Sequence, residues 1–235
     1  MRTAILIDGG FFLKRFPVCY PNRDRNNAQE VARTAFELAL SHLSERIGED
    51  VVRHSLYRIF FYDCPPLLKK AQLPKSRGSI DFSKSQQARF RLELHDELRR
   101  RRKVALRLGH LSEHAEWRLT DGTLKSLLSG AVRFEDLTDK EFAYDARQKG
   151  VDMRVGIDIA SLAFKKQVDQ IILVAGDADF VAAAKLARRE GIDFILDPLW
   201  NTIHSSLNEH VDGVRSTCPN PNRTMRPATA AAQVR

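Results

Sequence analysis

Short apolar runs alternate along the chain with segments of helical periodicity, and this alternation constrains the fold more than any other feature of the sequence. Five apolar runs have the length of buried strands: 3–10, 55–63, 104–111, 170–176 and 193–199. Helical spacing or helix-end signals mark five segments: 28–48, 84–103, 151–167, 180–191 and 202–213. Strands that alternate with helices pair in parallel. The sequence therefore predicts an α/β protein, a Rossmann-like three-layer α/β/α sandwich on a mostly parallel sheet of about five strands.

The chain length of 235 residues fits one domain, which we place at residues 1–215. Residues 112–147 are polar and follow no clear period, so we expect an insertion there. Residues 216–235 have no period and contain three prolines, which predicts a disordered C-terminal tail.

The composition of the chain indicates what kind of partner the protein binds and in which cell compartment it works. A net charge of +8 favours a polyanion, either nucleic acid or an anionic membrane surface. Cys19, Cys64 and Cys218 lie far apart, and we interpret them as ordinary thiols in a reducing compartment, not as a zinc site or a disulfide framework. No run approaches the ~20 apolar residues of a membrane span, and the first apolar run is too short for a signal peptide. We expect a cytoplasmic protein with no membrane partner.

Carboxylates follow the first and the fourth predicted strands. Asp8 comes after the first, and Asp177 and Asp179 come after the fourth, in the stretch "VAGDADF". The carboxyl ends of parallel strands meet at one edge of a sheet, where ligands bind, so these acids converge if the two strands are neighbours. Asp152 and Asp158 lie in the predicted helix just before the fourth strand, and Asp158 is unusual among apolar neighbours. Considered one at a time, these acids also have structural explanations. Asp8 suits a turn, Asp152 suits a helix cap, and Asp179 suits a helix N-terminus.

Taken together, these acids favour a hard cation. Like charges repel unless a cation or hydrogen-bond donors offset them. Mg²⁺ and Mn²⁺ take carboxylate oxygens, and the chain offers no His and Cys set for zinc. Such a site can activate water and orient a phosphodiester. The residues alone therefore predict an acidic Mg²⁺ or Mn²⁺ site for phosphoryl transfer.

Four segments together share a pattern with a known family: "ILIDGGFF", "QKGVD…GIDIASLA", "ILVAGDADFVAAAKLARREG" and "LNEHVDGV". Across residues 3–214 the chain resembles the NYN domain, a branch of the PIN-like nuclease superfamily, in its bacterial LabA-like form. The resemblance implies a PIN-like three-layer fold and metal-dependent endonucleolytic cleavage of RNA that leaves a 5′-phosphate. It also implies a set of catalytic metal ligands, namely Asp8, Asp152, Asp158 and Asp177, with Asp179 as a fifth metal ligand. The chain departs from the family at Phe11, where many members carry Asn.

Basic residues in three places suit phosphates, which position a nucleic acid without reading its bases. The expected nucleic-acid contacts are Lys14, Arg15, Arg99, Arg100, Arg101, Arg102 and Lys149. The four consecutive arginines also complement a helix C-terminus. Lys149 is either a surface lysine or a contact to the scissile phosphate. Phe11 and Phe12 precede Lys14 and either stack on a base or pack in the core.

We therefore expect a metal-dependent ribonuclease that binds RNA, single-stranded or structured. The preference for RNA rests on the resemblance, because nothing in the sequence visibly reads a 2′-hydroxyl. Two alternatives stay open: a non-cleaving RNA-binding regulator, and a subunit of a larger RNA-targeting or defence assembly. In the second, residues 112–147 or the tail would contact a protein partner or another copy of the chain.

Overall fold

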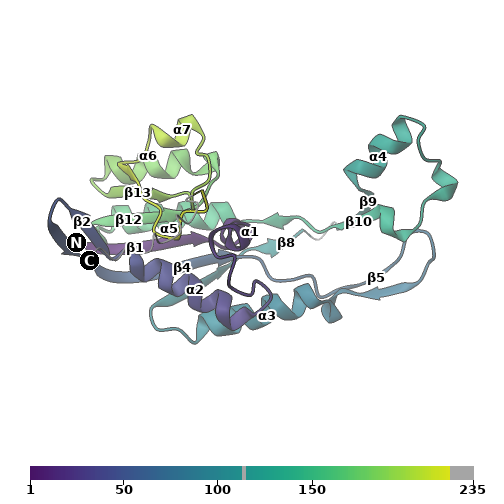
Figure 1. Ribbon diagram of the computed structural model, residues 1–235, viewed down its shortest axis with the longest axis horizontal. Helices are drawn as coiled ribbons and strands as arrows, with labels where there is room; N and C mark the ends of the chain where they lie inside the picture. The colour runs from purple at the N-terminus through teal and green to yellow at the C-terminus, as the bar shows by residue number, and fades with distance from the viewer. Residues whose placement is uncertain (113–114, 223–235) are drawn as a thin grey trace, which may run out of the picture.

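A computed structural model describes residues 1–112 and 115–222. Its centre is a six-stranded sheet in the order β14-β13-β12-β1-β4-β7, in which every neighbouring pair is parallel (Figure 1). In sheet order the strands are β14 (Gly213–Val214), β13 (Asp193–Asp197), β12 (Gln170–Val174), β1 (Arg2–Asp8), β4 (Ser55–Asp63) and β7 (Val104–Leu108). The predicted α/β sandwich is confirmed. The sheet has six strands instead of about five, because the short β14 adds to the edge beyond β13.

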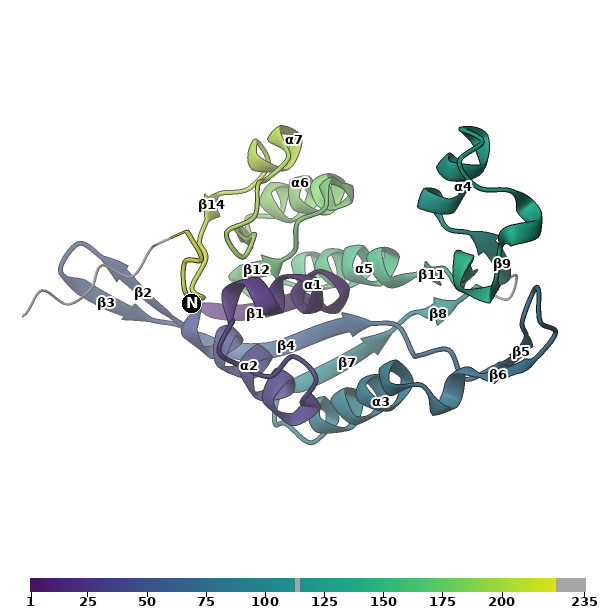
Figure 2. The same cartoon turned by 45° about the vertical axis from the view of Figure 1, so that its right-hand side comes forward.

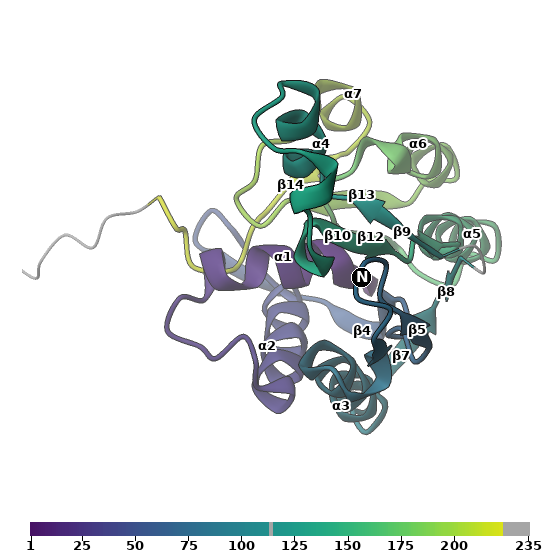
Figure 3. The ribbon, with the colours of Figure 1, turned by 90° about the vertical axis from the view of Figure 1, so that its right-hand side faces the viewer.

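Helices cover both faces of the sheet (Figure 3). One face carries α1 (Gly9–Cys19), α2 (Ala28–Ser41) and α3 (Gln86–Arg99), and the other carries α5 (Val151–Phe164), α6 (Val181–Arg189) and α7 (Ser205–Asn208). Alternate residues of β1 point to opposite faces: Ile5 and Ile7 pack with the first set, Ala4 and Leu6 with the second. Burial on both faces explains why the strands appear in the sequence as unbroken apolar runs. Within the described ranges, no helix is long and apolar enough to cross a membrane.

The helix predicted over residues 28–48 ends at Ser41, and its last part is a hairpin instead. Strands β2 (Ser44–Ile47) and β3 (Asp50–Arg53) pair antiparallel. Gly48, between them, has a φ of +64°, a left-handed conformation that glycine adopts at little steric cost. Gly48 is therefore the turn residue of a hairpin and not the end of a helix.

Beyond the carboxyl ends of β4 and β7 the chain forms a projecting arm, defined here as residues 65–85, 109–112 and 115–150 (Figures 1 and 2). Its elements are β5 (Lys70–Gln72), β6 (Ser79–Asp81), β8 (His110–Leu111), β9 (Glu116–Leu119), α4 (Asp121–Leu128), β10 (Phe142–Asp145) and β11 (Gln148–Lys149). An aromatic cluster joins the segments, because the ring of Tyr144 lies 5.0 Å from that of Phe82 and 5.1 Å from that of Trp117. Residues 115–147 thus pack against residues 65–85, and the status of 112–147 as an insertion into a domain spanning 1–215 stays a prediction.

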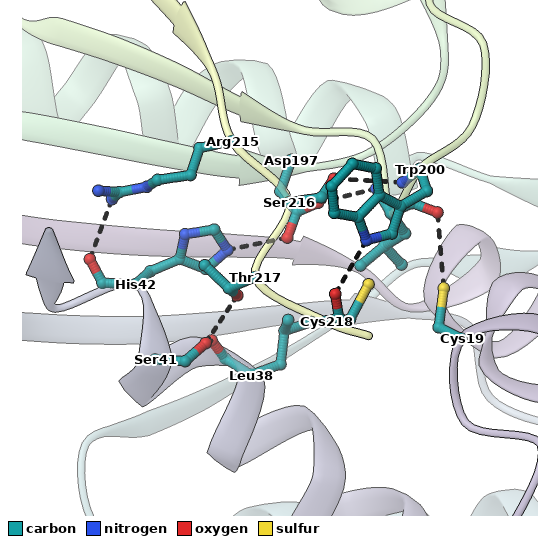
Figure 4. Close-up of polar contacts among 11 residues, drawn as sticks. Cys19, Leu38, Ser41, His42, Asp197, Trp200, Arg215, Ser216, Thr217 and Cys218 are labelled. Carbon is teal, nitrogen blue, oxygen red and sulfur yellow. Dashed lines mark hydrogen bonds and ion pairs between the residues drawn. The ribbon is translucent and has the colours of Figure 1, made fainter. Parts of the chain in front are cut away.

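The last described residues form a C-terminal strap, defined as residues 215–222. Ser216 Oγ donates to Asp197 Oδ1 at 2.7 Å, and Ser41 Oγ donates to Thr217 Oγ1 at 2.6 Å (Figure 4). The first residues of the tail expected to be disordered, 216–218, therefore bond to partners far away in the sequence. Residues 223–235 lie outside the described part of the chain.

Candidate active site

Asp8 is held at the carboxyl edge of the sheet by its role as the cap of α1. Its Oδ1 accepts a hydrogen bond from the backbone N–H of Phe11 at 3.1 Å. A Cβ on the next residue, Gly9, would lie 2.5 Å from both the Phe61 ring and the Tyr62 carbonyl oxygen. Only glycine lets the start of α1 approach β4 this closely, so the turn at Asp8 is tightly placed.

Asp177 and Asp179 follow β12, which lies directly beside β1 in the sheet. Asp177 Oδ1 accepts from the backbone N–H of Asp179 at 3.2 Å, and both side chains are exposed. A Cβ on Gly176 would lie 2.4 Å from the ring of Phe11, so the loop after β12 packs closely against the first turn of α1. The strand order therefore brings Asp8 and Asp177 to one edge.

Asp152 lies in the first turn of α5, two residues after the N-cap residue Gly150, whose φ is +76°. Partial desolvation and then repulsion from Asp177 and Asp179 raise the pKa of Asp152. Burial raises the pKa of Asp8, the backbone N–H of Phe11 opposes this, and the charge of Asp152 raises it further. Asp152 therefore lies between Asp8 on one side and Asp177 and Asp179 on the other, within electrostatic range of each. We call Asp8, Asp152, Asp177 and Asp179 the acid rim.

Within residues 1–112 and 115–222, none of the four acid-rim carboxylates forms an ion pair. In the same ranges no three His, Cys, Asp or Glu side chains are close enough to enclose a metal ion. The acid rim is therefore not a closed cage. It still fits Mg²⁺ or Mn²⁺, because such ions use one or two carboxylates and complete their octahedron with waters and substrate phosphates. A cation there would offset the repulsion between these carboxylates, which contributes to the raised pKa of Asp8 and of Asp152.

Asp158 is not brought into this group. Its Oδ2 accepts from the hydroxyl of Tyr62 at 2.9 Å and from Arg107 Nε at 3.0 Å. The guanidinium of Arg107, on β7, also lies over the ring of Phe60 at 5.3 Å. Asp158, predicted as a metal ligand, is thus paired with a cation, and the geometry supports a role in positioning Arg107. Local sequence gave no sign of this pairing, because β7 lies far from α5 in the chain.

Asp63, at the end of β4, is another carboxylate at this edge, and it too is neutralised. Its side chain is fully buried, pairs with Arg91 and lies 2.8 Å from His95 Nε2 through Oδ2. Burial disfavours the charged form, but the hydrogen bond from His95 and the charge of Arg91 outweigh it and lower the pKa of Asp63. This geometry gives Asp63 a structural role, which is to join the end of β4 to α3.

Two hollows flank α1 next to the acid rim, and Lys14 lines both. The first, about 510 Å³, lies between α1 and the loop after β12 and includes Arg15 and Asp177. The second, about 540 Å³, lies between α1 and α3 and includes Arg25 and Arg91. Lys14 is exposed, whereas Arg15 donates from Nε and Nη2 to the Leu199 carbonyl at 3.2 and 2.8 Å. Lys14 is therefore the freer of the two predicted phosphate contacts.

The remaining predicted contacts fall at opposite ends of the sheet. Lys149 is exposed in β11, three residues before Asp152, and so lies at the acid-rim end. The run from Arg99 to Arg102 ends α3 and leads into the amino end of β7, at the opposite edge. Arg99 and Arg100 pair within the helix, with Asp96 at 2.7 Å and Glu97 at 2.9 Å, and Arg101 covers the ring of Phe36 at 5.4 Å. The structure does not bring these four arginines to the acid rim.

The fold is a PIN-like α/β sandwich, with carboxylates at the edge of the sheet where ligands bind. A family model of the NYN domain matches residues 81–212, more than half of the chain, and the chain belongs to the NYN domain family. The match includes Asp152, Asp177 and Asp179 and begins after Asp8. The crystal structure of a protein of unknown function from Vibrio parahaemolyticus aligns with 91% of this chain and 90% of its own, at 14% sequence identity and a TM-score of 0.42. No curated protein matches the chain.

Proposed function

We propose that this protein is a metal-dependent endoribonuclease and that its acid rim holds Mg²⁺ or Mn²⁺. The observation that carries the proposal is the acid rim itself. Three separate elements bring four carboxylates to the edge where parallel sheets bind ligands, and the described residues give none of them an ion-pair partner. Membership of a nuclease family supports the reaction class. The choice of RNA and the LabA-like form rest on the sequence resemblance.

A cation bound at the rim would polarise a phosphoryl oxygen and neutralise charge on the scissile phosphodiester. Asp8 is held in place because the same carboxylate caps α1, and Asp177 is held by its bond to the Asp179 backbone N–H. Asp152, on α5, is close enough to both to share a bound cation with them. Lys14 and Lys149 lie at the same end and would hold phosphates on either side of the bond that breaks.

The arm offers a second surface for the same substrate. It projects from the carboxyl ends of β4 and β7, the edge that carries the acid rim (Figure 2). Its β5–β6 hairpin carries exposed Lys69, Lys70 and Arg77. Basic side chains contact the backbone of a nucleic acid, so an RNA longer than the acid rim would extend onto this hairpin.

Cleavage of labelled single-stranded RNA and of a folded tRNA tests the proposal, with Mn²⁺, Mg²⁺ or EDTA in the buffer. Asp177→Asn removes one rim charge, and Asp96→Asn is the matched control, since Asp96 is exposed on α3 and pairs with Arg99 at 2.7 Å. We expect metal-dependent cutting by the wild type and by Asp96→Asn, and none by Asp177→Asn.

Cutting that survives in purified Asp177→Asn would contradict the proposal. So would cutting that EDTA leaves unchanged. Salt-sensitive RNA binding without cutting by the wild type would instead favour the non-cleaving regulator.

A further inference from the structure

The C-terminal strap brings a second thiol to the end of α1. Trp200 Nε1 donates to the carbonyl of Cys218 at 2.9 Å and fixes this part of the strap (Figure 4). The Cys218 side chain then enters the core on the face that α1 and α2 cover, where it is 5% exposed. Cys19, the last residue of α1, is 1% exposed in the same cluster.

The two thiols are neighbours. They line one cavity of about 610 Å³ between α1, α2 and the strap, they belong to the same buried cluster, and they are drawn side by side in Figure 4. The Cys19 thiol also donates to the Leu199 carbonyl at 3.5 Å. Both are free thiols, and so is Cys64, which is buried in the cluster on the opposite face of the sheet. A disulfide requires the strap to move toward α1, and side-chain hydrogen bonds to Ser41, Asp197 and Trp200 hold the strap at this point.

The surroundings make the pair asymmetric. The neighbouring Cys218 thiol lowers the pKa of the Cys19 thiol, burial opposes this, and the charge of Arg15 lowers it further. The same contact, together with burial, raises the pKa of the Cys218 thiol. Arg15 and the Cys19 thiol donate to the same Leu199 carbonyl, so a guanidinium lies beside Cys19 and favours its thiolate. The thiolate is the reactive form of cysteine, which makes Cys19 the nucleophile and Cys218 the thiol that resolves its oxidised product.

We propose that Cys19 and Cys218 form a redox pair that closes to an intramolecular disulfide when a peroxide is the oxidant. The Cys19 thiolate attacks one oxygen of hydrogen peroxide, the O–O bond breaks, and hydroxide leaves, which gives a sulfenic acid. The Cys218 sulfur then attacks the Cys19 sulfur, the S–O bond breaks, and water leaves. The two thiols lose two electrons and two protons, and peroxide is reduced to two waters.

The disulfide would fasten the strap to the helix that carries Lys14 and Arg15. It would also remove the thiol hydrogen bond to the Leu199 carbonyl and leave that oxygen to Arg15 alone. The inference goes beyond the proposed nuclease activity and does not depend on it, because it concerns the chemistry of the two sulfurs.

Mass spectrometry of the full chain tests the inference. Reduced protein is treated with hydrogen peroxide, its free thiols are alkylated, and it is digested with trypsin without reductant. The tryptic peptides 16–23 and 216–223 carry Cys19 and Cys218, and peptide 59–69 carries Cys64 as an internal control. We expect the first two peptides to be linked, the third to be alkylated, and dithiothreitol to reverse the link.

Thermal unfolding supplies a second measurement. Because the link closes nearly the whole chain into a loop, peroxide should raise the melting temperature on the order of 10 °C in the wild type. Cys218→Ser should show no such shift. Full alkylation of Cys19 and Cys218 after peroxide, a link that involves Cys64, or a link between two molecules would overturn the inference.

Discussion

Replacing Gly176 with alanine would test whether the packing of α1 on the loop after β12 sets the spacing of the acid rim. The new Cβ would lie 2.4 Å from one ring atom of Phe11, where ordinary contact begins at 3.4 Å. The ring must therefore move by about 1 Å, the difference between these distances. Phe11 donates its backbone N–H to Asp8, so a shift of this turn displaces a rim carboxylate.

Overpacking of this kind destabilises a protein by ~1–3 kcal/mol. For a chain of this size each kcal/mol corresponds to roughly 2–4 °C, so the melting temperature should fall by about 2–12 °C. A displacement of 1 Å also lowers a catalysed rate by on the order of 100-fold, although no carboxylate is changed. Thermal unfolding and RNA cleavage measure the two effects separately.

Two further variants make the test specific. Phe11→Ala in the Gly176→Ala background removes the clashing ring, and it should recover part of both losses in a double-mutant cycle. Gly156→Ala is the matched control: Gly156 lies within α5 with nothing within 4 Å of its added Cβ, so it should gain about 0.5–1 kcal/mol. The reasoning fails if Gly176→Ala matches the wild type in both assays, or if the double variant is no better than the single one.

Three other perturbations have defined outcomes. Because the pKa of Asp8 is raised in the folded state, the folded chain binds more protons than the unfolded chain above the ordinary carboxyl pKa, and stability falls as pH rises through that window. Asp8→Asn keeps the oxygen that caps α1 and removes the charge, so it should raise the melting temperature in metal-free neutral buffer. It should also abolish any further rise on addition of Mn²⁺. A melting temperature below that of the wild type in metal-free buffer would contradict this. Asp63→Ala leaves Arg91 and His95 without their buried partner and should cost about 3–5 kcal/mol in urea unfolding, whereas a change below ~1 kcal/mol would refute the ion-pair account. Lys14→Ala should weaken RNA binding and reduce its salt dependence by about one counterion. Arg102→Ala should leave the affinity and the salt dependence unchanged. If both variants weakened binding equally, the RNA would have to contact both edges of the sheet.

The sequence by itself determined the parallel α/β fold and the position of the carboxylates at its edge. Strand and helix periods are local, and the continuous apolar runs already indicate strands buried on both faces. Parallel strands place their carboxyl ends together, so Asp8 and Asp177 were expected at one edge as soon as both runs were identified. The family resemblance came from the same local stretches.

Only the tertiary structure decided which of these residues act together. The order of the strands set β1 beside β12 and so completed the acid rim, while β7 supplied Arg107 and turned Asp158 away from it. The same topology sent the four arginines to the far edge and laid Cys218 against Cys19. These are contacts between residues distant in the chain, selected by packing and charge pairing across the sheet. The spacing of apolar residues along one strand or helix shows which side chains are buried. It does not show which distant residue each buried side chain will contact.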